Sequence, residues 1–250
     1  MKTIAVANQK GGIGKSTTAA ALSEGLRAKG FRTLVADLDP QGSITYIMGD
    51  DGTPPTVLEV LRRSATARES IRPTEQGDLL PGNSLLSSAD LEFTSIGKEY
   101  LLREALASVA VDYDFAILDT PPALGILTIN AFTAADAIIV PAGADILSIQ
   151  GIEQLTHTIN LVKTYCNPNV NMKGLLLTRH NHRTVLSRDF TEAIEAIAQG
   201  LGTFVYKAWI RDSVAVKEAQ ANRQGLLAYA PKSTSAMDYI SFVGEFLDAI

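Results

Sequence analysis

The chain has 250 residues, of which 46% are hydrophobic, so it can bury a sizeable core within one domain spanning residues 1–250. Its formal net charge of −5 argues against a protein coated with basic charge for nucleic acid. The single cysteine, Cys166, excludes a disulfide framework and a Cys-x-x-Cys metal or cluster site within one chain.

Targeting signals and local charge bound the function further. The N-terminus shows no basic-then-apolar signal pattern, and no apolar run approaches the roughly 18 residues that a membrane span needs. We therefore expect a cytoplasmic protein. Residues 173–232 carry nine basic and five acidic side chains, which leaves +4 there and −9 elsewhere. A basic face near the C-terminus and ordinary solvated surface are both compatible with this asymmetry.

Short apolar runs alternate with helix-period segments along the chain. This pattern predicts an α/β fold with a mainly parallel, twisted sheet of about seven or eight strands and helices on both faces. The readable strands are residues 3–8, 32–37, 78–82, 115–120, 137–142, 174–179 and 203–210. The predicted helices are residues 16–29, 57–62, 99–109, 148–164, 184–198 and 233–247. We see no repeat, no interdomain linker and no N-terminal helix-turn-helix extension, which favours a single domain.

After the first predicted strand the chain reads "NQKGGIGKSTTAAALSEGL", residues 8–26. A strand, a glycine-rich loop and a helix in this order indicate a phosphate-binding P-loop rather than a plain glycine turn. Backbone N–H groups would surround the phosphates, and the helix N-terminus would add positive charge. We expect Lys15 to reach the β- and γ-phosphates, Ser16 to ligate Mg²⁺ and Thr17 to face the α-phosphate. The other expected nucleotide contacts come from Gly11, Gly12, Ile13 and Gly14.

Three aspartates end two of the later strands. Asp37 and Asp39 stand in "VADLDPQGS", and Asp119 ends the apolar run "FAILD". In parallel α/β sheets ligands gather at the carboxyl ends of strands. Asp39 is therefore placed to orient a water molecule or to hold a Mg²⁺-bound water, and Asp119 resembles a Walker-B carboxylate. A turn or helix cap without metal is the alternative for each aspartate.

Several motifs together resemble one family. "KGGIGKST", "DLDPQGS" and "DTPPALGILTINAFTAADAIIVP", with "GLLLT" and a late "VKEA", are similar to the ParA/MinD superfamily of deviant Walker-A P-loop ATPases. The similarity is closest to the ParA (Soj-like) partition ATPases and covers nearly the whole chain. It implies ATP or ADP and Mg²⁺ as ligands, and a homodimer closed by ATP. It further implies that Lys10 crosses the dimer interface to the partner's phosphates.

The same resemblance assigns the remaining roles. It implies catalytic roles for Lys10, Lys15 and Asp39, and a Mg²⁺-linked role for Asp119 beside Ser16 and Asp39. It implies that two later segments recognise adenine, through Thr178, Arg179, Ile210, Arg211 and Ser213. Arg183 aligns with an arginine that holds non-specific DNA, and Lys217 and Lys232 are further candidates for DNA contact. The segment 210–219 departs from the family pattern at Asp212 and Ala215, where arginines are usual, which weakens both assignments.

The leading hypothesis is an ATP-dependent dimerisation switch. It would bind non-specific double-stranded DNA, associate with the nucleoid in its ATP state, and segregate a plasmid, mobile element or chromosome. A ParB-like centromere-binding adaptor would stimulate its slow hydrolysis. The alternative is a positioning ATPase for a non-DNA cargo such as a protein cluster or conjugation machinery. A MinD-like membrane positioner is disfavoured by the acidic tail after Lys232, and a metabolic P-loop enzyme by the short chain.

Overall fold

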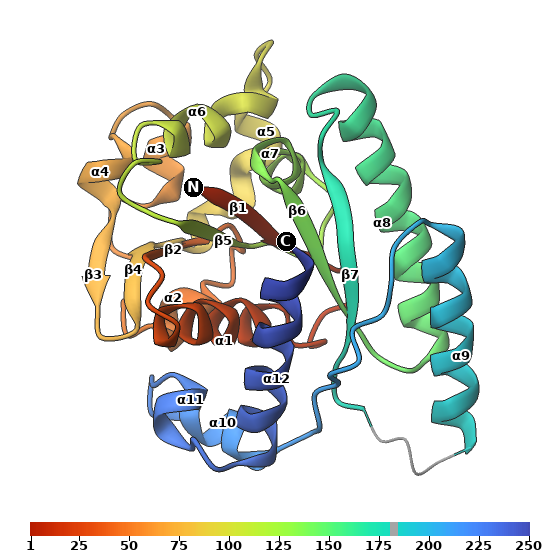
Figure 1. The fold of residues 1–250 in the computed structure, drawn as a ribbon. Coiled ribbons are helices and arrows are strands. Elements are labelled where there is room, and N and C mark those ends of the chain that lie inside the picture. Colours follow the sequence, from red (N-terminus) through yellow and green to blue (C-terminus); the bar gives the residue numbers. More distant parts are fainter. Residues whose placement is uncertain (181–184) are drawn as a thin grey trace.

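The computed structural model describes residues 1–180 and 185–250 (Figure 1). In this part of the chain seven strands form one sheet in the order β3-β4-β2-β5-β1-β6-β7. Neighbouring strands are parallel except β3 and β4, which are antiparallel. The strands are β1 (Lys2–Val6), β2 (Thr33–Asp37), β3 (Arg72–Thr74), β4 (Gly77–Leu80), β5 (Phe115–Asp119), β6 (Ala137–Ala142) and β7 (Asn171–Leu177).

Helices connect the strands and follow the last one. The α-helices before β5 are α1 (Lys15–Ala28), α2 (Ser43–Ile47), α3 (Val57–Leu61), α4 (Ala67–Ser70), α5 (Ala89–Glu92) and α6 (Leu101–Ala107), with the 3₁₀ helices η1 (Ser84–Ser88) and η2 (Lys98–Tyr100). The later α-helices are α7 (Ile126–Ala134), α8 (Ile146–Tyr165), α9 (Val185–Gly200), α10 (Val214–Ala221), α11 (Leu226–Tyr229) and α12 (Thr234–Ala249). None of these described helices is long and apolar enough to cross a membrane.

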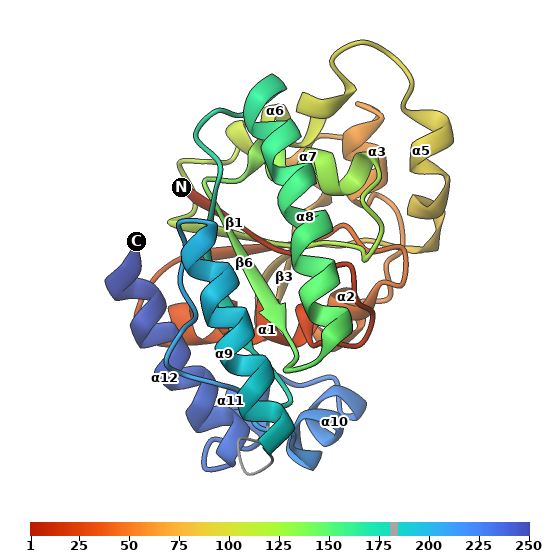
Figure 2. The same ribbon diagram turned by 90° about the vertical axis from the view of Figure 1, so that its right-hand side faces the viewer.

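The sheet separates two hydrophobic cores. Side chains alternate across β1, so Ala5 packs into one core and Ile4 and Val6 into the other. Helices α3, α6, α7, α8 and α9 contribute to the Ala5 core, and α1, α2, α10, α11 and α12 contribute to the opposite core. Figures 1 and 2 show α8 and α9 side by side next to β6 and β7. The predicted α/β fold with helices on both faces is confirmed.

Register brings the ends of three central strands together. Asp119 at the end of β5 pairs with Val6 of β1 on one side and with Asp37 of β2 on the other. The P-loop follows β1, so the carboxylates and the phosphate-binding loop all lie at the carboxyl ends of these parallel strands. Open α/β sheets bind ligands at the carboxyl ends of their strands, at the point where the connections from neighbouring strands diverge.

The prediction of a strand over residues 203–210 is wrong. This segment runs beside β7 but forms only two isolated bridges with it, Leu175 with Val205 and Thr178 with Ile210. Between the bridges, the N–H groups of Lys207 and Ala208 donate instead to the Glu245 carboxylate, each at 2.8 Å. Glu245 thus interrupts the pairing between the two bridges, and the pairing resumes where the Ile210 amide donates to the Leu177 backbone oxygen at 2.8 Å.

At the edge of the sheet farthest from β7 lies β3, a strand that was not predicted. β3 lies outside every predicted strand and helix and contains Pro73. Proline cannot donate to a ladder, but an edge strand needs donors on one side only, so β3 pairs antiparallel with β4. Because β3 and β4 are linked by two residues, this hairpin adds an antiparallel edge to an otherwise parallel sheet.

The predicted helices all exist, with shifted ends. The ranges 16–29, 57–62, 148–164 and 233–247 correspond to α1, α3, α8 and α12 within one to two residues. The range 99–109 is shorter as α6, because η2 occupies its first residues. The range 184–198 corresponds to α9, and its first residue, Thr184, lies outside the described residues. Helices α2, α4, α5, α7, α10 and α11 were not predicted, and all of them are nine residues or fewer.

Candidate functional site

The loop between β1 and α1 has the backbone of an anion cradle. Gly12 and Gly14 have φ angles of 69° and 92°, in the left-handed region that glycine adopts without strain. A Cβ built on Gly11, Gly12 or Gly14 would meet no atom within 4 Å, so the space in front of these backbone N–H groups is open. Gly14 is also the N-cap of α1 and offers no capping side chain. The first N–H groups of α1 and the open loop therefore suit phosphate oxygens.

A cavity of about 690 Å³ opens in front of this loop. Its lining includes Gln41, Tyr46 and Gln220 besides the P-loop. The predicted residues among its walls are Gly11, Gly12, Gly14, Lys15, Ser16, Thr17 and Asp39. Pro122, from the loop after β5, closes another side. The structure thus brings Asp39 and all predicted contacts among residues 11–17 except Ile13, which lines the neighbouring cavity beside Thr178, to one cavity of nucleotide size.

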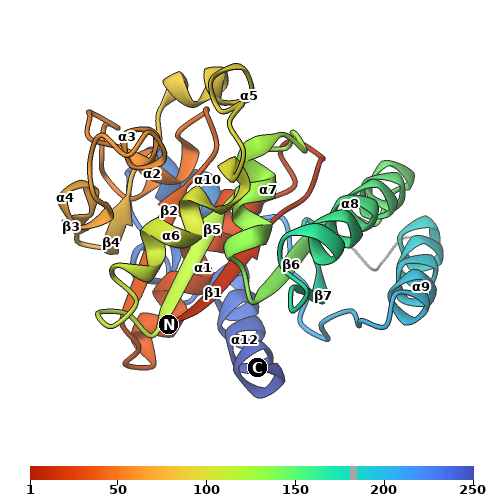
Figure 3. The ribbon, with the colours of Figure 1, turned by 90° about the horizontal axis from the view of Figure 1, so that it is seen from above.

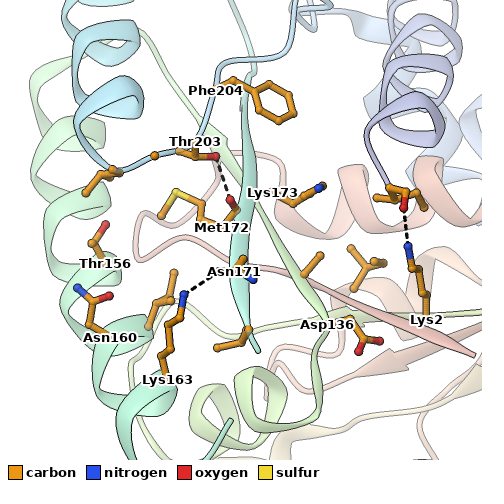
Figure 4. Close-up of a pocket in the computed structure, with 17 residues that line it drawn as sticks. Lys2, Asp136, Thr156, Asn160, Lys163, Asn171, Met172, Lys173, Thr203 and Phe204 are labelled. Carbon is orange, nitrogen blue, oxygen red and sulfur yellow. Dashed lines mark hydrogen bonds between the residues drawn. The ribbon is translucent and has the colours of Figure 1, made fainter. Parts of the chain in front are cut away.

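Another cavity, of about 520 Å³, lies at the amino ends of β1, β6 and β7 (Figure 4). Lys2, Lys163 and Lys173 come from three different elements there. It shares no lining residue with the cavity at the P-loop. Because this cavity lies at the amino ends of the strands, it has no access to the glycine-rich loop or the carboxylates at their carboxyl ends.

Lys15 is held inside the cradle. Its side chain is buried, with 6% of the residue exposed, and its Nζ lies 3.4 Å from the backbone oxygen of Lys10. Burial lowers the pKa of the Lys15 ammonium, while the charges of Asp119 and Asp39 act in the opposite direction. A buried ammonium whose neighbours are acidic is placed to receive further negative charge from phosphates.

Asp119 is the most isolated charge of the site. It is fully buried, and neither of its carboxylate oxygens has a hydrogen-bond partner among the described residues. Burial and the nearby charge of Asp37 raise its pKa well above the usual value, although the neighbouring Ser16 hydroxyl and Lys15 act against that rise. Unsatisfied buried carboxylate oxygens beside a serine hydroxyl are hard oxygen ligands, the kind that Mg²⁺ or its bound water takes. These residues fit the magnesium ion that the P-loop implies.

Asp37 and Asp39 have different surroundings. Asp37 is fully buried and accepts hydrogen bonds from the Thr45 hydroxyl at 2.6 Å and from the Thr45 and Asp39 amides at 3.0 Å. Burial nevertheless raises the pKa of Asp37 to about 6. Asp39 lines the cavity and accepts a bond from the Gln41 amide at 3.0 Å. Asp37 therefore orders the loop, and Asp39 is the carboxylate presented to a ligand.

Lys10 lies at the rim of the cradle rather than inside it. Its ammonium is 2.7 Å from Asp145 Oδ2, and both side chains are about one-third exposed, at 31% and 37%. Burial opposes ionisation of Asp145, but the Lys10 ammonium and the Ser148 amide hold the pKa of this carboxyl below its usual value. Asp145 is also the N-cap of α8, accepting from the Ser148 amide at 3.0 Å. In the isolated chain Lys10 is thus paired with its own α8.

The two segments predicted to recognise adenine meet beside the P-loop. Thr178, Arg179, Ile210, Arg211, Asp212 and Ser213 line a cavity of about 170 Å³ together with Gly12, Gly14 and Thr17. The Thr178 hydroxyl donates to the backbone oxygen of Ile13 at 2.7 Å, and Arg179 donates to that of Gly12 at 3.2 Å. We call the cavity formed by these two segments the base-side pocket.

The arginines of the base-side pocket are already paired with acids. Arg211 makes a two-pronged contact with Asp238, at 2.9 and 2.6 Å. Arg179 lies 3.8 Å from Asp212, and both side chains are more than half exposed. This local neutralisation makes the pocket less basic than its arginine content indicates.

The predicted DNA contacts are only partly described. Lys217 on α10 and Lys232 before α12 are exposed, and no carboxylate within the described ranges forms an ion pair with either. Arg183 lies outside the described residues. The two lysines are available to an anionic partner, whereas Arg211 is not.

Asp145, Gln220 and Tyr46 reach the site without a local sequence pattern that indicates it. Asp145 stands three residues before Ser148 at the start of a helix, a capping pattern that says nothing about Lys10. Gln220 donates to the Thr17 hydroxyl at 2.9 Å from an unpredicted helix. Tyr46 comes from the short helix α2. These three reach the site through tertiary packing, which local patterns do not reveal.

Comparisons with known proteins agree with the geometry. The family model described as an AAA domain matches residues 1–172. The chain is 35% identical to the sporulation initiation inhibitor protein Soj of Bacillus subtilis, covering 98% of this chain and 97% of Soj. It is 34% identical to the chromosome partitioning protein ParA of Myxococcus xanthus, covering 98% and 88%.

A solved structure is similar to the same degree. The cobyrinic acid a,c-diamide synthase of Mycobacterium smegmatis, with a bound ATP analogue and magnesium, superimposes with a TM-score of 0.86 at 35% identity. The match covers 99% of this chain and 94% of that one. Sequence and structure comparisons therefore point to the same P-loop fold.

Proposed function

This chain belongs to the ParA- and Soj-like family of P-loop NTPases, and from that premise we propose that it is an ATP-dependent dimerisation switch for positioning DNA. We further propose that residues 1–250 act as one ATPase domain. The observation that carries the proposal is that two lysines of the P-loop segment occupy different positions. Lys15 is buried inside the cradle, and Lys10 stands at its rim with a partly exposed ammonium.

The position of Lys10 supports a role between subunits. Its ammonium is directed to Asp145 at the mouth of the P-loop, where a second molecule can approach. Two ATP molecules facing each other would bring a large negative charge together, and a lysine from each subunit would neutralise it. Dimerisation would therefore require that Lys10 leave Asp145 for the partner's phosphates.

The carboxylates support hydrolysis. Mg²⁺, when bound, would neutralise charge on the β- and γ-phosphates, and Ser16 with Asp119 would hold it. Asp39 lines the same cavity and would orient the attacking water. Lys15 would stabilise charge on the phosphates from inside the cradle. Among the described residues, no arginine lines this cavity, and both arginines of the base-side pocket, Arg179 and Arg211, lie beside acids, which fits slow hydrolysis awaiting a stimulating adaptor.

DNA binding would use the exposed lysines. Lys217 and Lys232, with Arg183, would contact phosphates without reading sequence. Each such contact steepens the salt dependence of binding by about one unit. A ParB-like adaptor that stimulates hydrolysis completes the proposed cycle.

The solved diamide synthase makes amide synthesis a second candidate, because it matches at the same identity as Soj. An amide-forming enzyme needs its second substrate beside the γ-phosphate. The cavity at the amino ends of β1, β6 and β7 does not reach the P-loop, so a substrate bound there would not lie beside the γ-phosphate. The geometry therefore supports the switch better. A positioning ATPase for a non-DNA cargo shares every feature of the switch except the DNA contacts.

The test is ATP-dependent binding to random-sequence duplex DNA at low salt, with Asp39→Ala to retain ATP and Lys10→Ala alongside. Asp39→Ala should dimerise and bind DNA with ATP, added salt should weaken the complex, and Lys10→Ala should abolish both effects. Dimerisation without DNA retention would favour a non-DNA cargo. ATP hydrolysis that is stimulated by cobyrinic acid and glutamine, with no dimer, would favour amide synthesis.

A further inference from the structure

The loop between the Mg²⁺-side carboxylate and the next helix is fixed at both ends. It runs from Asp119 to the start of α7, and Pro122 in its middle lines the nucleotide cavity. At the first end, the Thr120 hydroxyl donates to the backbone oxygen of Val6 at 3.0 Å. At the second end, the Thr128 hydroxyl donates to the backbone oxygen of Ala123 at 2.6 Å. The free part of the loop is therefore short, and its geometry depends on where α7 begins.

The start of α7 is capped from outside. Its N-cap is Gly125, which has no side chain to accept a hydrogen bond. The Ile126 amide donates instead to Asp90 Oδ1 at 2.7 Å, across 36 residues of sequence. A carboxylate at a helix N-terminus satisfies an otherwise free N–H and interacts favourably with the helix dipole. Asp90 thus does for α7 what a local Ser, Thr or Asp usually does.

Glycine at position 125 leaves room for the Asp90 carboxylate at the start of α7. A Cβ built on Gly125 would lie 2.8 Å from the Asp90 carboxyl carbon and closer still to its oxygens. The Gly125 backbone is extended, with φ −87° and ψ −165°, which other residues also adopt. A side chain at position 125 would therefore displace the Asp90 carboxylate, although the backbone conformation itself does not favour glycine.

Asp90 is itself anchored. Helix α5 lies next to α7 (Figures 1 and 3) and is held by the buried side chains of Ala89 and Phe93. Glu92, two residues after Asp90, forms a two-pronged ion pair with Arg62 just after α3. The Asp90 carboxylate is therefore presented to α7 from a segment with its own attachments.

The segment before Asp90 contacts the other carboxylate strand. The Gly82 amide donates to the Thr45 hydroxyl at 3.0 Å, and that hydroxyl donates to Asp37 at 2.6 Å. The chain from Gly82 to Asp90 thus touches the strand that leads to Asp39 at one end and the helix that follows Asp119 at the other. It therefore connects the surroundings of Asp37 with the start of α7.

From these contacts we propose that Asp90 is a positioning residue for the loop 120–125, acting through the first turn of α7. The inference rests on the proposed ATP hydrolysis. Asp90 does not reach the nucleotide cavity, so its loss leaves nucleotide affinity intact. It sets where Pro122 and the Asp119 end of the loop stand when the γ-phosphate is cleaved, so its loss slows turnover.

The test is a double-mutant cycle on the full chain. Asp90→Ala should lower kcat for ATP hydrolysis about fivefold, change the Kd for ATP less than twofold, and speed hydrogen exchange at the Ile126 amide. Asp90→Asn, which keeps an acceptor oxygen, should recover part of the loss. Gly125→Ala should resemble Asp90→Ala, because its methyl group would displace the carboxylate. The pair Asp90→Ala/Gly125→Ala should be no worse than either alone, since the clash disappears with Asp90.

Three outcomes overturn the inference. One is wild-type kcat and wild-type Ile126 exchange in Asp90→Ala. Another is a Gly125→Ala defect that adds fully to that of Asp90→Ala, which would show that glycine serves a different need. The third is an equal loss of ATP affinity and thermal stability, which would mark a general folding role. If the wild type binds ATP without hydrolysing it, the proposed function fails, and Ile126 exchange with and without ATP still decides the role of Asp90.

Discussion

The phosphate end and the base-side pocket of this site are built in opposite ways. At the phosphate end, Asp37 and Asp119 are buried at the ends of neighbouring central strands, and Lys15 is buried at the start of α1, which follows the P-loop. At the base-side pocket, Arg179 and Asp212 are more than half exposed and pair across a loop and a segment beside the sheet edge.

Because of this difference, the two regions do not tolerate substitutions equally. A buried charge has no water to replace a lost partner, so every group of the phosphate end depends on the others. An exposed ion pair contributes little to stability and is screened by salt. The phosphate end is therefore restricted to a few residue types, whereas the base-side pocket tolerates the departures at Asp212 and Ala215.

The strongest test of this contrast removes the buried lysine. Lys15→Ala should weaken ATP binding on the order of a hundredfold, because a charge-assisted contact to phosphate is worth about 3 kcal/mol when desolvated. Lys163→Ala, in the cavity at the amino ends of the strands (Figure 4), is the matched control and should leave ATP binding unchanged. Calorimetric titration with ATP and Mg²⁺ measures both. Comparable losses in the two variants would contradict the assignment of the nucleotide to the P-loop cavity.

An intermediate effect is expected from a charge reversal at the base-side pocket. Asp212→Arg removes an acid and releases Arg179, so it should strengthen ATP-dependent binding to duplex DNA about tenfold at low salt. The slope of log Kd against log salt should steepen by about one unit. Asp248→Arg makes the same charge change at an exposed position of α12, away from this pocket. Equal gains in both variants would mean that bulk charge, and not this surface, attracts DNA.

The smallest expected effect comes from releasing Lys10. Asp145→Ser removes the ion pair but keeps an N-cap for α8, so the helix should remain intact. A partly exposed pair is worth up to about 1 kcal/mol, so the ATP concentration for half-maximal dimerisation should fall two- to fivefold. Sedimentation velocity over an ATP series measures this shift. A rise in that concentration would show that Asp145 promotes dimerisation instead of restraining Lys10.

The phosphate end was predictable because its requirements are local. A strand, a glycine-rich loop and a helix occupy consecutive residues, and the aspartates directly end predicted strands. Their convergence follows from the geometry of a parallel sheet alone. The sequence therefore predicts that Lys15, Ser16 and Asp39 lie together, as they do around one cavity, and that Asp119 ends a strand, which lies next to β1.

The features that were not predicted depend on distant residues. The segment 203–210 has the composition of a strand, yet Glu245 on α12 takes two of its amides. The cap of α7 comes from Asp90, and the partner of Lys10 is Asp145, 135 residues away. In each case one side chain from another element changes the outcome, and no window of neighbouring residues contains that information.

The interception of the Lys207 and Ala208 amides by Glu245 also bears on how copies of this molecule associate. An edge strand with a row of free donors and acceptors is a template for pairing with another chain. Here the segment beside β7 has two of its amides occupied by a carboxylate, and at the other edge β3 is three residues long and contains Pro73. Both rims of the sheet therefore resist strand-to-strand growth into fibres. The proposed ATP-dependent dimerisation would therefore use the helical faces and the mouth of the P-loop rather than the sheet edges.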